Sequence, residues 1–152
     1  MATVHAAAEG DVGAPAETVY GYIADFREHH PKFLPDAFSN FQIEVGGVGA
    51  GTITRFRTTA GGRTREYRMA VAEPEPGRVL TESDTASSLV TTFTVTPKGA
   101  ASSVRIESSW QGAGGIGGFF ERLFAPRVLR KIYLDELARL DAYARERAAQ
   151  AS

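Results

Sequence analysis

The stretch SLVTTFTVTPKGAASSVRIESSW, residues 88–110, decides the fold. It contains two runs rich in Val, Thr, Ile and Phe, 88–96 and 101–110, which the turn sequence PKGA separates. Apolar and polar residues alternate along both runs, and this period of two is typical of strands with one buried face. The short connection predicts an antiparallel hairpin.

The same pattern extends toward the N-terminus. Four similar runs occupy residues 38–45, 52–59, 63–73 and 78–84, and turn residues such as GGVGAG and PEPG separate them. Together the six runs predict an antiparallel meander. Residues 3–12 predict a seventh strand, followed by a turn at GDVGAP.

Alternation along these runs predicts which side chains face the interior of the sheet. The expected inward residues are Phe41, Ile43, Val45, Thr54, Phe56, Tyr67, Met69, Val71, Phe93, Val95, Val104, Ile106, Ser108 and Trp110. The expected solvent-facing residues are Arg55, Arg57, Glu66, Arg68, Arg105 and Glu107. The run 78–84 is ambiguous, so its facing stays open.

Three segments outside the meander favour helix. Residues 14–26 carry apolar residues at helical spacing and predict a short amphipathic helix, and the prolines of 27–38 limit that segment to a brief helical turn and a loop. Residues 119–149 contain no Gly and carry an apolar stripe, which predicts a long helix that Pro126 should kink or split. The glycine-rich segment 111–118 is expected to be a flexible connection that acts as a hinge or as a passive connector.

These elements predict an α+β fold in one domain over residues 1–152. A curved seven-stranded antiparallel sheet would wrap around the long C-terminal helix, with two short helices after the first strand. A helix about 10 Å across covers only part of a curved sheet, so an apolar cavity is expected between them. A fully packed core is the alternative.

Composition excludes several classes of function. The 17 Lys and Arg nearly balance the 18 Asp and Glu, so we expect no nucleic-acid partner. The chain has no Cys, no signal-peptide pattern and no apolar run long enough to span a bilayer. We therefore expect a cytoplasmic protein without stable membrane insertion.

The order of these elements resembles one known family. The opening strand, the helix APAETVYGYIADF, the string DFREHHPKFLP, GAGT before a strand, VAEPEPGRVL, TTFTVTPKGAASSVRIES and the closing helix are similar to the polyketide cyclase/dehydrase and lipid-transport group of the START-related SRPBCC superfamily. The resemblance implies a helix-grip fold and a hydrophobic cavity for lipids, polyketides, sterols, quinones or aromatic metabolites. It implies a mouth near 27–38 and the closing helix, and it does not imply one activity.

A set of residues is expected to line this cavity, with Thr54, Tyr67, Ser108 and Trp110 able to orient a polar end of the ligand. The predicted ligand-binding residues are Phe33, Phe41, Ile43, Thr54, Phe56, Tyr67, Met69, Phe93, Ile106, Ser108, Trp110, Phe120, Leu123 and Phe124. Alternatively, they are core residues whose polar atoms find backbone partners.

His29, His30 and Tyr67 are weak candidates for acid–base catalysis. The favoured interpretation is that the two histidines lie on a surface turn and point in different directions into solvent. The only other histidine is His5, so no local spacing supplies a metal site, and no cofactor is expected.

Two groups of basic residues have alternative readings. Arg55, Arg57, Arg63, Arg65 and Arg68 could hold a phosphate or carboxylate, but a solvated sheet surface neutralised by Glu66 and nearby acids is favoured. Arg122, Arg127, Arg130 and Lys131 flank Phe119, Phe120 and Phe124 and could touch an anionic lipid surface. Cations that merely flank packed phenylalanines are favoured there.

Three functions are consistent with the sequence. The leading hypothesis is binding or carriage of a hydrophobic small molecule by a monomer or homodimer. The second is a polyketide aromatase/cyclase-type enzyme that uses pocket His, Tyr or Arg. The third is a protein-interaction module with a vestigial cavity.

Overall fold

The computed structural model describes residues 3–151, apart from the side chains of Ile116, Phe119 and Phe120. Within this range one antiparallel sheet has the order β1-β7-β6-β5-β4-β3-β2. Its strands are β1 (Thr3–Val12), β2 (Phe38–Val45), β3 (Ile53–Ala60), β4 (Arg63–Glu75), β5 (Val79–Asp84), β6 (Val90–Lys98) and β7 (Ala101–Gln111). All seven predicted strands are confirmed.

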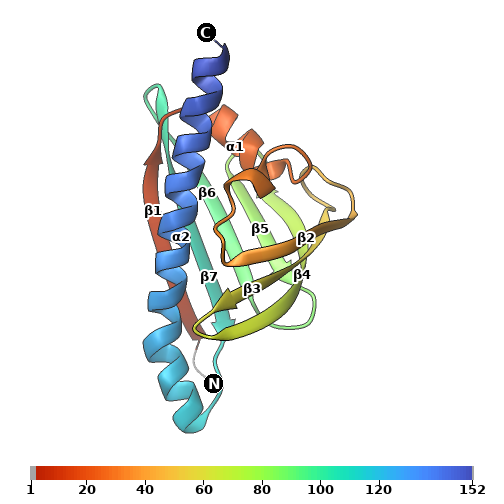
Figure 1. Cartoon of the computed structure of the whole chain (residues 1–152), viewed down its shortest axis with the longest axis vertical. Helices are drawn as coiled ribbons and strands as arrows, with labels where there is room; N and C mark the ends of the chain where they lie inside the picture. The colour runs from red at the N-terminus through yellow and green to blue at the C-terminus, as the bar shows by residue number, and fades with distance from the viewer. Residues whose placement is uncertain (1–2, 152) are drawn as a thin grey trace.

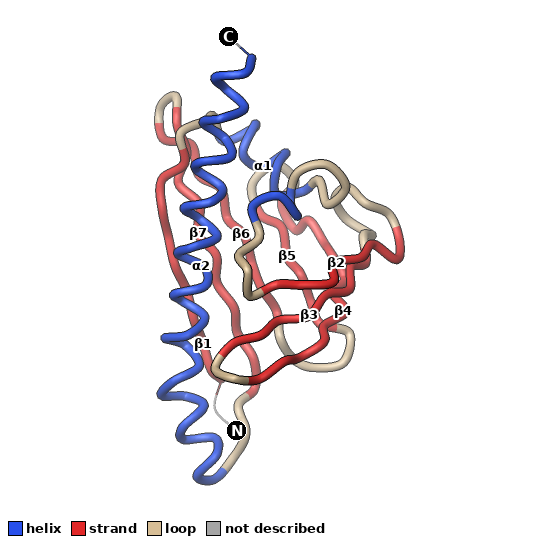
Figure 2. Tube along the Cα trace, in the orientation of Figure 1, coloured by secondary structure: helices blue, strands red, loops and turns tan. Residues whose placement is uncertain are grey.

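The helices are α1 (Ala16–Ala24), the 3₁₀ turn η1 (His30–Phe33) and α2 (Gly115–Ala151). Figure 1 shows α2 lying along β1, and the end of the sheet formed by β2, β3 and β4 curling round beside the helix. The tube in Figure 2 shows α1 and η1 closing one end of the curved sheet. The predicted helix-grip fold is therefore confirmed. Among the described residues, no helix combines the length and apolarity needed to span a bilayer.

Small residues on β1 let α2 approach the sheet closely. Ala6, Ala8 and Gly10 alternate along the inward face of β1, and both alanines are buried. A Cβ atom added at Gly10 would lie 3.6 Å from Leu137 of α2. The helix therefore packs against the β1 edge and leaves the more strongly curved strands at a distance.

The start of α2 differs from the prediction. The helix begins at Gly115 and continues without a break through Pro126, so of the two predicted alternatives, a kink or a split, the split does not occur. Gly115, Gly117 and Gly118 belong to its first turn and not to a flexible connection. A Cβ atom at Gly118 would lie 1.7 Å from the Ala113 carbonyl oxygen, so glycine is needed for the chain to turn into the helix.

Strand β2 departs from simple alternation. Its pairing with β3 shifts register between Ser39 and Gln42 and again between Ile43 and Val45, and Asn40 has a φ of 52°. The irregularity turns Phe38 as well as Phe41 toward the interior. It also leaves Val45 50% exposed, so the prediction that Val45 faces inward is wrong.

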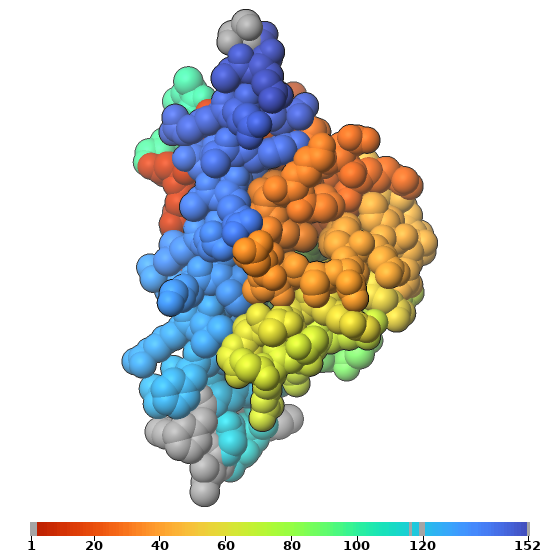
Figure 3. Space-filling model, viewed as in Figure 1, coloured from red at the N-terminus to blue at the C-terminus, as the bar shows by residue number. Residues whose placement is uncertain are grey.

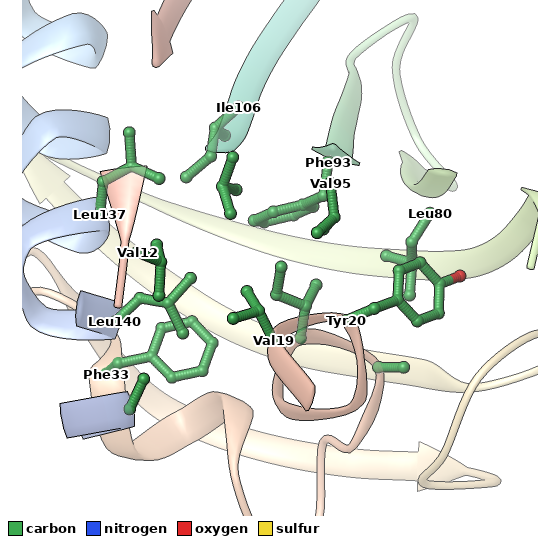
Figure 4. Packing of buried hydrophobic residues seen from close by; sticks show 14 of the residues in the cluster. Val12, Val19, Tyr20, Phe33, Leu80, Phe93, Val95, Ile106, Leu137 and Leu140 are labelled. Carbon is green, nitrogen blue, oxygen red and sulfur yellow. The ribbon is translucent and has the colours of Figure 1, made fainter. Parts of the chain in front are cut away.

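The interior has a solid half and a hollow half. At the α1 end, Val19, Leu80, Val95, Leu137 and Leu140 pack together almost without exposed surface (Figure 4). The next inward positions along the same elements border empty space. They are Glu82 on β5, Phe93 on β6 and Glu136 on α2.

Candidate functional site

A cavity of about 1000 Å³ occupies the hollow half, between α2 and the concave face of the sheet. Its walls are formed largely by aromatic side chains of β2, β3, β4, β6 and β7 and by apolar side chains of α2. Figure 3 shows an opening beside the orange segment that follows α1, with green strand atoms lying deep behind it. Large apolar-walled cavities of this kind are typical of small-molecule sites.

One wall is an almost continuous aromatic surface. The ring centroid of Phe56 lies 5.4 Å from that of Phe38, 6.3 Å from that of Phe41 and 5.8 Å from that of Tyr67. Cross-strand pairing of Phe56 with Tyr67 places these rings side by side. The wall offers flat apolar surface to a ring system.

His30 lies at the inner end of the cavity, which we call the cavity floor and define by His30, Glu82 and Glu136. The imidazole is only 2% exposed and stacks on Phe26, with ring centroids 4.6 Å apart. Its Nδ1 lies 2.6 Å from the carbonyl oxygen of Ile23, and because a carbonyl only accepts, Nδ1 carries the proton. That bond directs Nε2 toward Glu136, whose Oε2 lies 3.7 Å away.

Two carboxyl groups complete the floor. Glu136 is 2% exposed and its Oε2 has no hydrogen-bond partner, and Glu82, at 7% exposed, forms no hydrogen bond with a described residue. Burial raises the pKa of Glu82 to about 7, against the opposing effect of His30. Burial alone would lower the pKa of His30, but Glu136 and Glu82 together outweigh it and raise that pKa.

A chain of hydroxyl groups adjoins the floor. The Tyr133 hydroxyl contacts the Ser108 hydroxyl, whose oxygen lies 2.6 Å from the Thr91 hydroxyl. Burial raises the pKa of Tyr133 to about 12, so its phenol stays protonated. No group of three or more His, Asp or Glu side chains in the described part of the chain is arranged to hold a metal ion.

The opposite end of the cavity is positively charged. Arg63 and Arg65 lie at inward positions of β4, in line with Tyr67, and both border the cavity. Arg55 and Arg68 lie on the outer face, where each forms an ion pair with Glu44. Arg57, Arg63 and Arg65 are exposed, as the favoured prediction of a solvated surface requires, but Arg63 and Arg65 lie on the cavity side of the sheet and not on its outer face.

The predicted ligand-binding residues are distributed over several environments. Seven border the cavity: Phe41, Phe56, Tyr67, Met69, Phe93, Trp110 and Phe124. Four are buried outside its wall: Phe33, Thr54, Ile106 and Ser108. Ile43 is half-buried and Leu123 is exposed, both outside the wall, and the side chain of Phe120 lies outside the described residues.

The three catalytic candidates do not lie together. His30 and Tyr67 border the cavity, whereas His29 lies outside it, with Nδ1 2.6 Å from the Tyr143 hydroxyl. Burial and the nearby Arg147 lower the pKa of His29. The two histidines do point in different directions, but the expectation that both are solvated is wrong for His30.

Sequence reasoning missed both carboxyl groups of the floor. A signal for Glu136 was present, because it interrupts the apolar stripe of α2 one position before Leu137. Glu82 lies two residues after Leu80, so the same strand face carries a fully buried leucine and an acid. Only the burial of Leu80 settles which face of β5 is inward.

Comparisons with known proteins agree with this geometry. The sequence profile of the family described as "Polyketide cyclase / dehydrase and lipid transport" matches residues 1–145. No curated protein matches the chain. The solution structure of the KanY protein is 35% identical, with a TM-score of 0.84, and the match covers 95% of this chain and 99% of that chain.

Two more distant structures share the fold. The Zhui aromatase/cyclase from Streptomyces sp. R1128 is 16% identical with a TM-score of 0.76, covering 97% of this chain and 96% of that chain. A START superfamily protein from Mycobacterium smegmatis is also 16% identical, with a TM-score of 0.71, covering 91% and 98%.

Proposed function

The chain belongs to the polyketide cyclase/dehydrase and lipid-transport family of the START-related superfamily, and we propose that it binds a hydrophobic small molecule inside its cavity. One observation carries the proposal, which is the cavity of about 1000 Å³ with an aromatic wall and a buried polar floor. Its volume lies at the upper end of the usual range for small-molecule sites.

Apolar burial supplies the driving force for such binding. A ligand that buries ~300 Å² of apolar surface gains on the order of 7 kcal/mol, at about 25 cal/mol per Å², before the entropic cost of association. The aromatic wall favours a flat ring system over a flexible chain, because offset stacking adds to the gain from burial.

Trp110 makes the proposal directly testable. It is the single tryptophan of the chain and borders the cavity, so its fluorescence should respond to an aromatic ligand. Ala125→Phe would fill space, because Ala125 borders the cavity, while Ala142→Phe on the exposed side of the same helix is the matched control.

We expect the wild type and Ala142→Phe to bind anthracene with equal affinity, and Ala125→Phe to bind at least tenfold more weakly. Native mass spectrometry of the purified protein should also detect a co-purified small molecule. Equal affinity of the two variants, or no response of Trp110 to any aromatic probe, would contradict binding in this cavity.

The cavity floor favours a second candidate function, acid–base catalysis on a bound ketone. In the neutral tautomer fixed by Ile23, the Nε2 lone pair of His30 is available as a base, and Glu136 lies close enough to stabilise the imidazolium. Such a pair could remove a proton next to a carbonyl group of a ligand stacked on the aromatic wall.

Hydrogen–deuterium exchange at the α-carbon of an aromatic β-diketone tests this candidate without knowledge of the natural substrate. We expect wild-type protein to accelerate exchange and His30→Gln to reduce that acceleration by ~100-fold or more, as is usual for loss of a general base. His29→Gln is the control, because His29 lies outside the cavity. Unchanged exchange in His30→Gln, with binding retained, would exclude His30 as the base.

A further inference from the structure

The cavity floor lacks hydrogen-bond donors for its carboxyl groups. Glu136 Oε2 is buried without a partner, and Glu82 forms no hydrogen bond with any described residue. No described N–H or O–H group forms a hydrogen bond with these oxygens. His30 donates Nδ1–H to Ile23 and its Nε2 lies 3.7 Å from Glu136 Oε2, while the hydroxyls of Tyr133 and Thr91 contact Ser108. A ligand that reaches the floor must therefore bring its own donor.

A hydroxyl group fits this floor better than an ammonium group. When it is protonated, the imidazole of His30 supplies a cationic partner for Glu136, 3.7 Å away. The approach to the floor passes the rings of Phe41, Phe56 and Phe93, which border the cavity and offer no hydrogen-bonding group. A phenol or alcohol loses less hydration on that path than a charged amine.

The cavity mouth, which we define by Arg63 and Arg65, has the opposite character. Neither guanidinium forms an ion pair with a described residue, although Arg55 and Arg68 of the same hairpin do. Outside the floor, the acid among the described residues that border the cavity is Glu121, whose Oε1 accepts a hydrogen bond from the Ala113 N–H. Ser88 adds a hydroxyl whose oxygen accepts from Gln111 N–H and whose own proton is free to donate.

The spacing of the two ends limits the size of the ligand. Glu82 pairs across the sheet with Val71, which lies six positions after Arg65 on β4. Six residues of strand span roughly 20 Å, and the inward reach of the Glu and Arg side chains shortens this distance. A rigid ligand that touches both ends requires about three or more fused rings.

We infer that the ligand is a hydroxylated fused-ring aromatic acid that binds in one orientation, with a hydroxyl group on Glu82 and Glu136 and a carboxylate or phosphate group at Arg63 and Arg65. This inference rests on the proposed binding function and specifies its ligand class. The two polar ends fix the direction of entry, while the aromatic wall supplies most of the contact surface.

Four probes distinguish the contributions of the hydroxyl group and of the acid group to the binding affinity. They are anthracene, 2-hydroxyanthracene, anthracene-2-carboxylic acid and 6-hydroxyanthracene-2-carboxylic acid. Their affinities are measured by quenching of Trp110 fluorescence at low and high salt. Glu82→Met removes an acceptor from the floor, and the double variant Arg63→Met/Arg65→Met removes the charge of the mouth. Glu66→Met and Arg55→Met on the outer face are the matched controls.

We expect the wild type to bind 2-hydroxyanthracene and anthracene-2-carboxylic acid each at least fivefold more tightly than anthracene. Glu82→Met should abolish the gain from the hydroxyl group and keep the gain from the acid, and the double arginine variant should do the reverse. Only the acid-containing probes should bind more weakly at high salt. If Glu82→Met fails to fold, Glu136→Met serves the same purpose.

The outcomes distinguish this inference from the function on which it rests. If anthracene and its derivatives all fail to bind, the proposed function itself is wrong. If anthracene binds but both gains persist in both variants, or if 2-(aminomethyl)anthracene binds more tightly than 2-hydroxyanthracene, the inferred ligand class is wrong.

Discussion

Glu82 is the residue of the cavity floor whose ionisation can be followed most directly, through its effect on stability. Its carboxyl group sits two positions from the fully buried Leu80 and faces His30 and Glu136. Placing an acid there costs stability, because the ionised form loses its hydration without gaining a hydrogen bond. Residues that lower stability without a structural benefit are commonly kept for function.

The first prediction concerns the pH dependence of stability. Between 4.5, the ordinary pKa of a glutamate, and about 7, the pKa of Glu82 in the folded state, the folded protein holds more protons than the unfolded chain. The contribution of Glu82 to the free energy of unfolding therefore falls as pH rises through this window. The raised pKa of His30 acts in the same direction, because its stabilisation is lost as pH rises above the ordinary value of 6.5.

Glu82→Gln removes the titrating group and keeps the shape of the side chain. Urea unfolding at pH 5 and pH 8 should show that the variant gains stability over the wild type with rising pH, by on the order of 1 to 3 kcal/mol at pH 8. Glu66→Gln on the outer face should show no such change. A stability difference that is independent of pH would mean that Glu82 is not protonated in the folded protein near neutrality.

At the scale of the elements, the alternation of apolar and polar residues predicts the inward-facing side chains correctly where a strand is regular. The inward positions of β6 and β7 are buried as predicted, from Phe93 and Val95 to Val104 and Ile106. On β2 the same rule placed Val45 inside, because a bulge is set by pairing with β3 and not by the local pattern. The six residues of β5 do not alternate clearly in polarity, so the sequence does not predict which face of this strand is inward, and Glu82 lies on it.

The candidate site was less predictable for a related reason. Cavity-bordering aromatic residues obey alternation, so Phe41, Phe56 and Tyr67 could be named from the sequence. The floor instead depends on where packing stops between α2 and the sheet, which is a property of the assembled molecule. His30 shows this, since only the contacts of Phe26 and Ile23 remove it from solvent.

The connection between β2 and β3 gives the second prediction. Gly49 donates its N–H to the Ala24 carbonyl at 2.9 Å and so ties this loop to the end of α1, with a φ of 69°. A Cβ atom there would lie 2.3 Å from Glu73 Oε1, which accepts the Ala50 N–H. Gly49→Ala should therefore lower the free energy of unfolding by about 2 kcal/mol or more, from strain and the lost contact.

Gly51→Ala is the control for this experiment. Gly51 also has a positive φ, of 90°, but a Cβ atom there meets nothing within 4 Å. Gly51→Ala should therefore lower the free energy of unfolding only by the contribution of backbone strain, about 1 kcal/mol. Equal losses in chemical denaturation of the two variants would show that the Glu73 contact contributes nothing.

The third prediction concerns Pro126 in α2. The ring removes a backbone donor from the helix interior, yet the helix continues through it. Pro126→Ala should restore the hydrogen bond to the Arg122 carbonyl and raise the free energy of unfolding by about 1 to 3 kcal/mol. Arg127→Ala, at the neighbouring exposed position, should change it by less than about 0.5 kcal/mol. A loss of stability in Pro126→Ala would indicate that the helix needs the proline conformation there.

At the scale of the whole molecule, the division into a solid and a hollow half predicts unequal local stability along one helix. Tyr133, Leu137, Leu140 and Ala144 of α2 belong to the buried hydrophobic core, whereas in 121–132 only the partly buried Leu129 and Ile132 pack against it. Local unfolding is easier where few apolar contacts are lost. Without ligand, backbone amides of 119–130 should therefore exchange with deuterium at least tenfold faster than those of 136–146.

A ligand in the cavity should remove most of that difference, because it supplies the missing apolar contacts to the first half of α2. At a free concentration 100 times its dissociation constant, a ligand bound only by the folded state adds about 2.7 kcal/mol to the free energy of unfolding. Hydrogen exchange measured with and without anthracene should show protection that increases mainly in 119–130. The cavity-filling Ala125→Phe should mimic part of this protection in the absence of ligand, whereas Ala142→Phe should not. Uniform protection along α2 in the ligand-free protein would mean that the cavity leaves no weak half in the helix.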